Sequence, residues 1–379
     1  MAKDVVFLVH GMGVNVDGDG KAAKHWHDGA IKALKAAAER PETLDLLHIE
    51  PGDFDDFVEF IPINYDQIFN DLVGNWETRG AQLAKFPGFE AVGGLFQNAG
   101  EISNNFFWTH ASDVVLYRLP VVRVAVVLTV LSQIINGLKE HNNASWSVIA
   151  HSLGTAVATD ALHHYFRMYF EPEGAPGAGW ATPPRAVAMV ANVSAALQTS
   201  DFPSYSSRLT PVKMVKTPDY YITADHVLDP FTWIRPFRPD TPEWTKARED
   251  GDFIEATALK DLGFLQGGDS ARFLADPKRA ILESHPHGFA NYIANPRVHL
   301  PILSKILRRG IVDKEKATQV EETYEADVKN SLKSDVVTEA KALLADAVRD
   351  APQTELSKLT SLQELYQRLK ALHEVWSKS

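Results

Sequence analysis

The sequence predicts an α/β protein built on a mostly parallel β-sheet with helices flanking its faces. Two short apolar runs, VVFLVHG (5–11) and WSVIAHS (146–152), are typical of strands that are buried on both sides. A segment with helical composition follows each run, at 25–40 and at 153–170. Strands that alternate with helices favour parallel pairing, because a parallel connection has to cross back over the sheet.

The rest of the chain extends this pattern. An apolar stretch at 114–135 carries Arg118 and Arg123 and is interrupted by Pro120. Two charges and a proline make an uninterrupted membrane span a poor interpretation, so we expect a buried helix that begins near Pro120. Further strands are expected within three segments: 56–66, 185–195 and 218–230.

Composition excludes several classes of function. The chain has 379 residues, a formal net charge of −11 and no cysteine. The acidic balance gives no basic surface for nucleic acid and little attraction to anionic membranes. Without cysteine there are no disulfides, thiolate metal sites or cysteine nucleophiles. The N-terminus enters an apolar strand directly and shows no secretory signal, so a cytoplasmic location is expected.

No metal or cofactor site is predicted. The segment DGDGK, which begins at Asp17, is similar to a calcium-binding loop, but the sixth position of that loop would be Ala22 instead of glycine. His25 and His27 flank Trp26 on a helix, so they point to different faces and are poorly placed to share one ion.

The segment Ala150-His151-Ser152-Leu153-Gly154 matches the strand-turn-helix pattern of a nucleophilic serine, with Ala150 in place of the usual first glycine. Small residues two positions before and two after the serine are needed because the turn is tight and lies against a neighbouring strand and helix. A serine that only caps the helix would not need them. We therefore expect Ser152 to be a nucleophile.

The first strand ends in Val9-His10-Gly11-Met12-Gly13. In parallel sheets, ligands bind beyond the carboxyl ends of the strands, and this segment lies at such an end. Backbone N–H groups of Met12 and Leu153 are the two expected donors of an oxyanion hole, which would hold the negative oxygen formed in acyl transfer.

At this point the chain resembles the α/β-hydrolase family, through FLVHGMG and VIAHSLGT, and it looks most like the lipase and esterase branches. The resemblance implies an α/β-hydrolase sheet in residues 1–310, with lid-like insertions at about 67–113 and 233–280. Members of the family often begin with an additional hairpin. Here the oxyanion strand stands at the N-terminus, so the resemblance implies a trimmed core.

The family order of serine, acid and then histidine limits the other two triad positions. Asp225 and Asp229 both follow the strand expected in 218–230, and the resemblance favours Asp229, which begins an Asp-Pro turn, with Asp225 as the alternative acid. For the base, the resemblance favours His287, because such hydrolases often follow the catalytic histidine with aromatic residues and a proline, as here; His285 is the alternative.

These residues predict a serine hydrolase that cleaves carboxylic esters through Ser152, His287 and Asp229 and an acyl-enzyme. The expected partner is a small-molecule ester with an apolar group. The alternatives are a thioesterase or amidase with the same triad, and a non-catalytic binding protein with this fold.

Residues 311–379 are expected to form a helical C-terminal extension. Val320, Tyr324, Val328 and Leu332 are spaced four residues apart in a highly charged background, which is typical of an amphipathic helix. We expect these helices to pack on the main domain; the alternative is an oligomer contact with a second copy of the chain.

Overall fold

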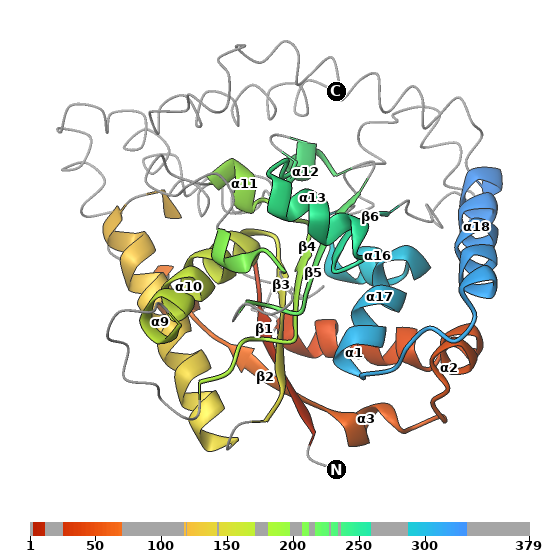
Figure 1. The fold of residues 1–379 in the computed structure, drawn as a ribbon, viewed down its shortest axis with the longest axis horizontal. Helices are drawn as coiled ribbons and strands as arrows, with labels where there is room; N and C mark the ends of the chain where they lie inside the picture. Colours follow the sequence, from red (N-terminus) through yellow and green to blue (C-terminus); the bar gives the residue numbers. More distant parts are fainter. Residues whose placement is uncertain are drawn as a thin grey trace, which may run out of the picture.

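A computed structural model of the chain describes residues 3–11, 26–69, 117–118, 120–141, 144–170, 181–197, 207–211, 217–226, 229–233, 236–258 and 287–331. Its centre is a six-stranded sheet in the order β2-β1-β3-β4-β5-β6, in which every neighbouring pair is parallel (Figure 1). The predicted parallel α/β architecture is therefore confirmed. The strands are β1 (Asp4–Val9), β2 (Val58–Ile63), β3 (Trp146–His151), β4 (Ala186–Val190), β5 (Tyr220–His226) and β6 (Phe253–Ala258).

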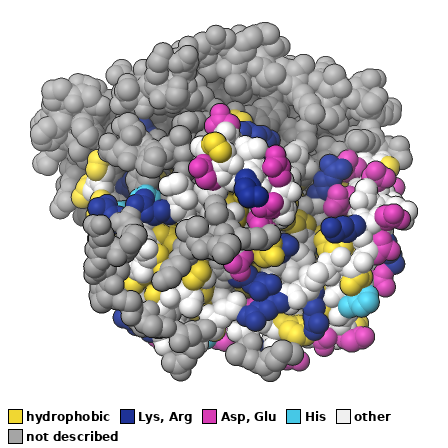
Figure 2. Space-filling view, viewed as in Figure 1, with side chains coloured by type: hydrophobic (Ala, Val, Ile, Leu, Met, Phe, Trp, Pro, Cys, Tyr) yellow, Lys and Arg dark blue, Asp and Glu magenta, His cyan; other side chains and the backbone are white. Residues whose placement is uncertain are grey.

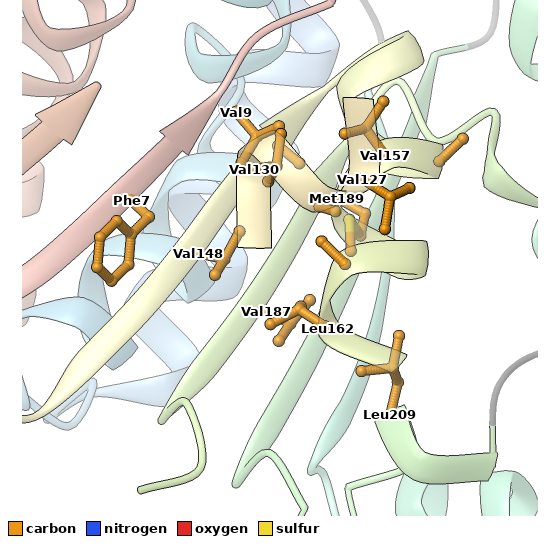
Figure 3. Close-up of a cluster of buried hydrophobic side chains, with 14 of the residues drawn as sticks. Phe7, Val9, Val127, Val130, Val148, Val157, Leu162, Val187, Met189 and Leu209 are labelled. Atoms are coloured by element: carbon orange, nitrogen blue, oxygen red, sulfur yellow. The ribbon is translucent and has the colours of Figure 1, made fainter. Parts of the chain in front are cut away.

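Alternate side chains of β1 enter two different cores. Val5, Phe7 and Val9 face the helices α9 (Pro120–Glu140) and α10 (Leu153–Tyr169), and Figure 3 shows part of this cluster. Val6 and Leu8 face the opposite core. Because successive side chains of a strand point to opposite faces, an apolar run without alternation is explained by helices on both sides.

The opposite core is closed by three helices that are distant in sequence: α1 (Trp26–Ala38), α16 (Phe289–Ile293) and α17 (Pro296–Ile306). Proline begins α17, where its missing N–H costs nothing, and the Asn295 side chain accepts a hydrogen bond from the Arg297 N–H. In Figure 1 these helices lie across the sheet from α9 and α10.

The remaining described helices are short or peripheral. These helices are α2 (Pro41–Leu47), α3 (Phe54–Phe57), α11 (Ser194–Leu197), α12 (Pro230–Trp233), α13 (Pro242–Glu249), α18 (Lys314–Ser331) and the 3₁₀ helix η1 (Ser207–Leu209). Helix α2 begins at Pro41, directly after the predicted end of α1.

Helix α9 is the apolar helix expected near Pro120. Within the described ranges it alone is long and apolar enough to cross a membrane. Half of its most apolar 18-residue stretch is buried inside the protein. Its inner face packs in the α9–α10 core through Val126, Val130 and Ile134. Arg123 is buried too, and it forms two hydrogen bonds with the Asp160 carboxylate, at 2.6 and 2.8 Å.

One expectation needs correction. The segment 233–280 was expected to be an insertion, but β6 lies within it and pairs with β5 along the edge of the sheet. Residues 253–258 therefore belong to the central sheet. The other expected insertion, 67–113, lies outside the described residues except for 67–69.

Helix α18 contacts α2 and α17. Ala317 packs with Leu46 and Leu300, and Arg297 forms an ion pair with Glu321 at 3.2 Å. Near α18 and α13, acidic and basic side chains are interspersed on the surface (Figure 2). The rest of the expected extension, 332–379, lies outside the described residues.

Candidate active site

The candidate site lies where the strand order reverses. From β1 the chain goes to β2 on one side, whereas β3 pairs with the other side of β1. The residues that follow β1 and β3 therefore emerge side by side at the carboxyl edge of the sheet, with Val9 paired to Ala150. Crevices at such reversal points are the usual ligand sites of open parallel sheets.

Ser152 occupies the turn between β3 and α10 in a strained conformation, with φ 55° and ψ −130°. A non-glycine residue rarely has positive φ, and such strain persists only where the surrounding structure enforces it. Here the Ser152 N–H donates to the Val190 carbonyl at 3.0 Å, and its own carbonyl accepts from the Thr155 N–H at 2.8 Å. The turn lies at the carboxyl end of β3, and Ser152 is only 7% exposed there.

The two small residues beside Ser152 have a steric role. A Cβ added to Gly154 would lie 2.5 Å from the Val9 carbonyl oxygen and still closer to that of His10. Backbone atoms cannot move aside as side chains do, so only glycine allows α10 to start this close to β1. Ala150 is fully buried between neighbouring strands, and its methyl group is accommodated there.

Ser152, His287 and Asp229 form a continuous hydrogen-bonded chain. The Ser152 Oγ lies 2.5 Å from His287 Nε2, and His287 Nδ1 lies 2.7 Å from Asp229 Oδ2. A carboxylate only accepts, so Nδ1–H donates to Asp229 and Nε2 is left to accept from the serine hydroxyl. His287 is 3% exposed and Asp229 is fully buried.

The Asp229 carboxylate is held in its charged form despite its burial. Burial alone would raise its pKa, but the charge of His287, hydrogen bonds from His287 and Tyr292 and the nearby His226 outweigh it and lower the pKa below the usual value. Asp229 Oδ1 also accepts from the Phe231 N–H at 3.0 Å, in the turn that begins α12.

Asp225, the alternative acid, has a different partner. Its carboxylate lies 2.7 Å from the Arg238 guanidinium, which also contacts Glu255 at 3.3 Å. Asp225 is the next-to-last residue of β5 and takes part in an ion-pair network at the edge of the sheet. The contact with His287 is made by Asp229.

Of the three other predicted positions, only Leu153 lies within the described residues. Leu153 is the first residue of α10, where helix N–H groups lack acceptors within the helix. Met12, the other expected oxyanion donor, and His285, the alternative base, lie outside the described residues.

Sequence reasoning missed several neighbours of the triad. The Tyr292 hydroxyl donates to Asp229 Oδ2 at 2.6 Å, and His151 Nε2 donates to the His287 carbonyl at 2.7 Å. The Phe231 ring lies 4.7 Å from the His287 ring, measured between centroids. The aromatic residues after His287 were a weak signal for Tyr292, but nothing in the sequence connects them to an aspartate more than sixty residues earlier.

His10 follows β1 and is buried beside the site. Its Nδ1 donates to the Gly11 carbonyl at 2.5 Å, and its ring stacks on Tyr65 at 4.5 Å. Burial lowers the pKa of His10 despite the charge of Asp66. The His10 side chain is thus held against Tyr65 and Gly11 at the carboxyl end of β1.

The arrangement unites a serine hydroxyl, a histidine that can take its proton and a buried carboxylate that orients the histidine. In the part of the chain that the structure describes, no three His, Cys, Asp or Glu side chains are grouped closely enough to hold a metal ion. Neither a family model, nor a curated protein, nor a solved structure matches the chain.

Proposed function

We propose that the chain is a serine hydrolase of the α/β-hydrolase type that cleaves carboxylic esters. The observation that supports this best is the hydrogen-bonded chain from Ser152 through His287 to Asp229, which begins at a strained residue in a strand-to-helix turn. The order serine, aspartate and histidine along the chain agrees with that family, as does the location of the serine after a central parallel strand.

In the proposed reaction, the Ser152 Oγ attacks the ester carbonyl carbon while its proton passes to His287 Nε2. The tetrahedral intermediate collapses, the bond to the leaving alkoxide breaks, and His287 gives that alkoxide the proton. A water molecule then attacks the acyl-enzyme, again with His287 as base, and releases the carboxylic acid and Ser152. Asp229 holds His287 in the required tautomer and stabilises its positive charge.

We assign the developing oxyanion to the backbone N–H groups of Met12 and Leu153. An anion is stabilised at the start of α10, because the first N–H groups of the helix lack acceptors within it and the helix dipole is positive at this end. The close approach of Gly11 to the Ser152 side chain, which would put a Cβ 3.1 Å from Oγ, supports a donor immediately after Gly11.

The principal alternative is a non-catalytic protein with the same fold. A binding protein has no need to keep serine in a strained turn, because strain at this position lowers stability without serving a contact. The strain of Ser152 together with an intact histidine and carboxylate favours the enzyme. Thioesterase or amidase activity would use the same groups.

A fluorophosphonate probe tests the proposal, because it labels only an activated serine. Wild type and Ser194→Ala should be labelled, whereas Ser152→Ala should not. Ser194 is a suitable control because it is also buried and hydrogen-bonded, with its hydroxyl 2.7 Å from Asn192. Folded wild-type protein that neither takes up the probe nor hydrolyses p-nitrophenyl esters of any chain length would favour the binding protein.

The leaving group can be tested in the same way. Rates on a p-nitrophenyl ester, a thioester and an anilide with the same acyl group would separate the three candidate activities. We expect the ester to react fastest, and a higher kcat/KM for the thioester would reassign the substrate class without changing the roles of the triad.

A further inference from the structure

Asp229 Oδ2 accepts two hydrogen bonds from side chains of different kinds. His287 Nδ1 lies 2.7 Å from it and the Tyr292 hydroxyl 2.6 Å. The other oxygen, Oδ1, is occupied by the Phe231 N–H at 3.0 Å. The carboxylate is fully buried, so these three donors take the place of water around its charge.

Tyr292 lies in the short helix that begins two residues after His287. It lies in α16, is fully buried, and packs edge-on against His226 at 5.5 Å between ring centroids. Burial and the adjacent Asp229 charge raise the pKa of Tyr292 well above its usual value. The hydroxyl therefore stays protonated near neutral pH and donates to the carboxylate.

We propose that Tyr292 is a positioning residue of the triad: its hydroxyl fixes the Asp229 carboxylate toward His287 and limits how strongly that carboxylate attracts the imidazole proton. A charged acceptor that shares its charge between two donors binds each less strongly than it would bind one alone. Tyr292 thereby limits how strongly Asp229 stabilises the imidazolium that forms in the reaction. This role rests on the proposed hydrolase function.

The other charged and titratable groups around the pair are fixed by their own contacts. From β3, His151 donates to the His287 carbonyl at 2.7 Å. From β5, His226 packs on Tyr292, and Asp225 is paired with Arg238 at 2.7 Å. Helix α12 contributes Phe231 and the neutral Thr232, whose side chain also hydrogen-bonds to the Tyr292 hydroxyl. Removing the Tyr292 hydroxyl therefore takes away one donor to Asp229 and this neutral contact, and it leaves the charged groups unchanged.

Tyr292→Phe tests the role without removing the ring. With one donor lost, Asp229 stabilises the imidazolium more strongly, so the acid limb of kcat/KM against pH should move up by about half to one pH unit. KM should stay nearly unchanged. Tyr165→Phe is the matched control, because that tyrosine is also fully buried and its hydroxyl donates to the Thr182 carbonyl at 2.8 Å, away from the triad.

A second substitution acts in the opposite direction. Difluorotyrosine at position 292 keeps the ring and donates a stronger hydrogen bond, so it should move the acid limb to lower pH. Shifts of opposite sign for the two variants, with none for Tyr165→Phe, would support the proposal. An acid limb that stays unmoved in both variants would overturn it, even if thermal stability falls.

The His287 resonances provide a test that does not depend on turnover. In protein labelled with ¹⁵N-histidine, with the signal assigned by its loss in His287→Ala, the titration midpoint of His287 should rise in Tyr292→Phe and stay unchanged in Tyr165→Phe. An unchanged midpoint in Tyr292→Phe would overturn the role of Tyr292. If the midpoint rises but wild type takes up no fluorophosphonate, the proposed hydrolase function fails and the coupling of Tyr292 to the pair stands.

Discussion

Gly11 lies directly against Ser152: a Cβ added to Gly11 would come 2.6 Å from the Ser152 Cβ and 3.1 Å from its Oγ. Real Cβ atoms do not approach so closely, so a side chain at position 11 must push the segment after β1 away from the serine. This is the segment to which we assign one oxyanion donor.

Gly11→Ala should therefore lower kcat by about 100-fold or more, the usual cost of displacing one such donor, while the protein still folds. Gly29→Ala is the control, because a Cβ at Gly29 in α1 meets no atom within 4 Å. This control should keep full activity and gain about 0.5–1 kcal/mol in stability, since alanine favours a helix interior. Equal kcat values for Gly11→Ala and wild type in an ester assay would contradict the assigned oxyanion segment.

Ser152 allows strain and chemistry to be measured separately. Ser152→Ala and Ser152→Gly should each lose at least ~10⁴-fold in kcat, because the nucleophile is absent. The glycine variant should be more stable than the alanine variant by about 1 kcal/mol, because glycine adopts φ 55° without strain. Urea unfolding of the two variants measures this difference. A more stable alanine variant would mean that the turn relaxes around Ser152.

Asp229 and Asp225 can be compared directly. Asp229→Asn should lower kcat by up to ~10⁴-fold, because the amide no longer selects the tautomer of His287. Asp225→Asn removes only an exposed ion pair with Arg238, so it should change kcat by no more than a few-fold. Circular dichroism checks that both variants fold. A larger loss of kcat in Asp225→Asn than in Asp229→Asn would show that Asp225, in β5, is the acid of the triad.

The parts of the fold and the site that the sequence predicted are those encoded by local pattern. Strands buried on both faces, such as β1 and β3, show themselves as apolar runs. The turn around Ser152 requires small neighbours within two residues, and that requirement is visible in the sequence.

Features that depend on tertiary context were missed. Edge strand β6 has the sequence FIEATA, with partly exposed positions next to the charged helix α13, so no apolar run reveals it. The contact between Tyr292 and Asp229 joins two distant segments, and only the packing of α16 beside the end of β5 brings them together. The choice of Asp229 over Asp225 came from the family resemblance, through the Asp-Pro turn, and the partners of Asp225 could not have been deduced from the sequence.

The buried pair of Arg123 and Asp160 should support the fold without affecting the chemistry. Asp160 accepts two hydrogen bonds from Arg123 and one from the Tyr117 hydroxyl at 2.6 Å. Asp160→Ala removes the carboxylate that neutralises a buried guanidinium, so it should cost about 3–5 kcal/mol of unfolding free energy. kcat per folded molecule should stay unchanged, since Asp160 lies two turns beyond Ser152 on α10.

The control for this pair lies on the surface. Lys35 and Asp55 are 2.7 Å apart but exposed, so Lys35→Ala should cost less than about 1 kcal/mol. Urea unfolding of both variants makes the comparison. Similar small losses for Asp160→Ala and Lys35→Ala would show that the buried network contributes little to stability.

His299 makes stability depend on pH in a direction that can be worked out. It is fully buried in α17, where Nδ1 donates to the Ile293 carbonyl at 2.8 Å and Nε2 lies 3.2 Å from the Thr43 hydroxyl. Burial, together with the charge of Arg40, lowers its pKa from 6.5 to about 3. Between these two values the unfolded chain binds a proton that the folded protein does not. Stability therefore falls as the pH decreases through this window, by up to about 1.4 kcal/mol per pH unit.

Comparison with His299→Gln isolates this contribution. Glutamine does not titrate, and its side chain can both donate and accept hydrogen bonds. When the pH falls from about 6.5 to about 4.5, the unfolding free energy of His299→Gln should therefore decrease by about 2–3 kcal/mol less than that of wild type. Other buried histidines, such as His10 and His163, remain in both proteins and cancel in the difference. Urea unfolding across this range measures the two curves. If they run parallel, His299 takes up a proton in the folded protein as readily as in the unfolded chain, and α17 must open locally to admit the charge.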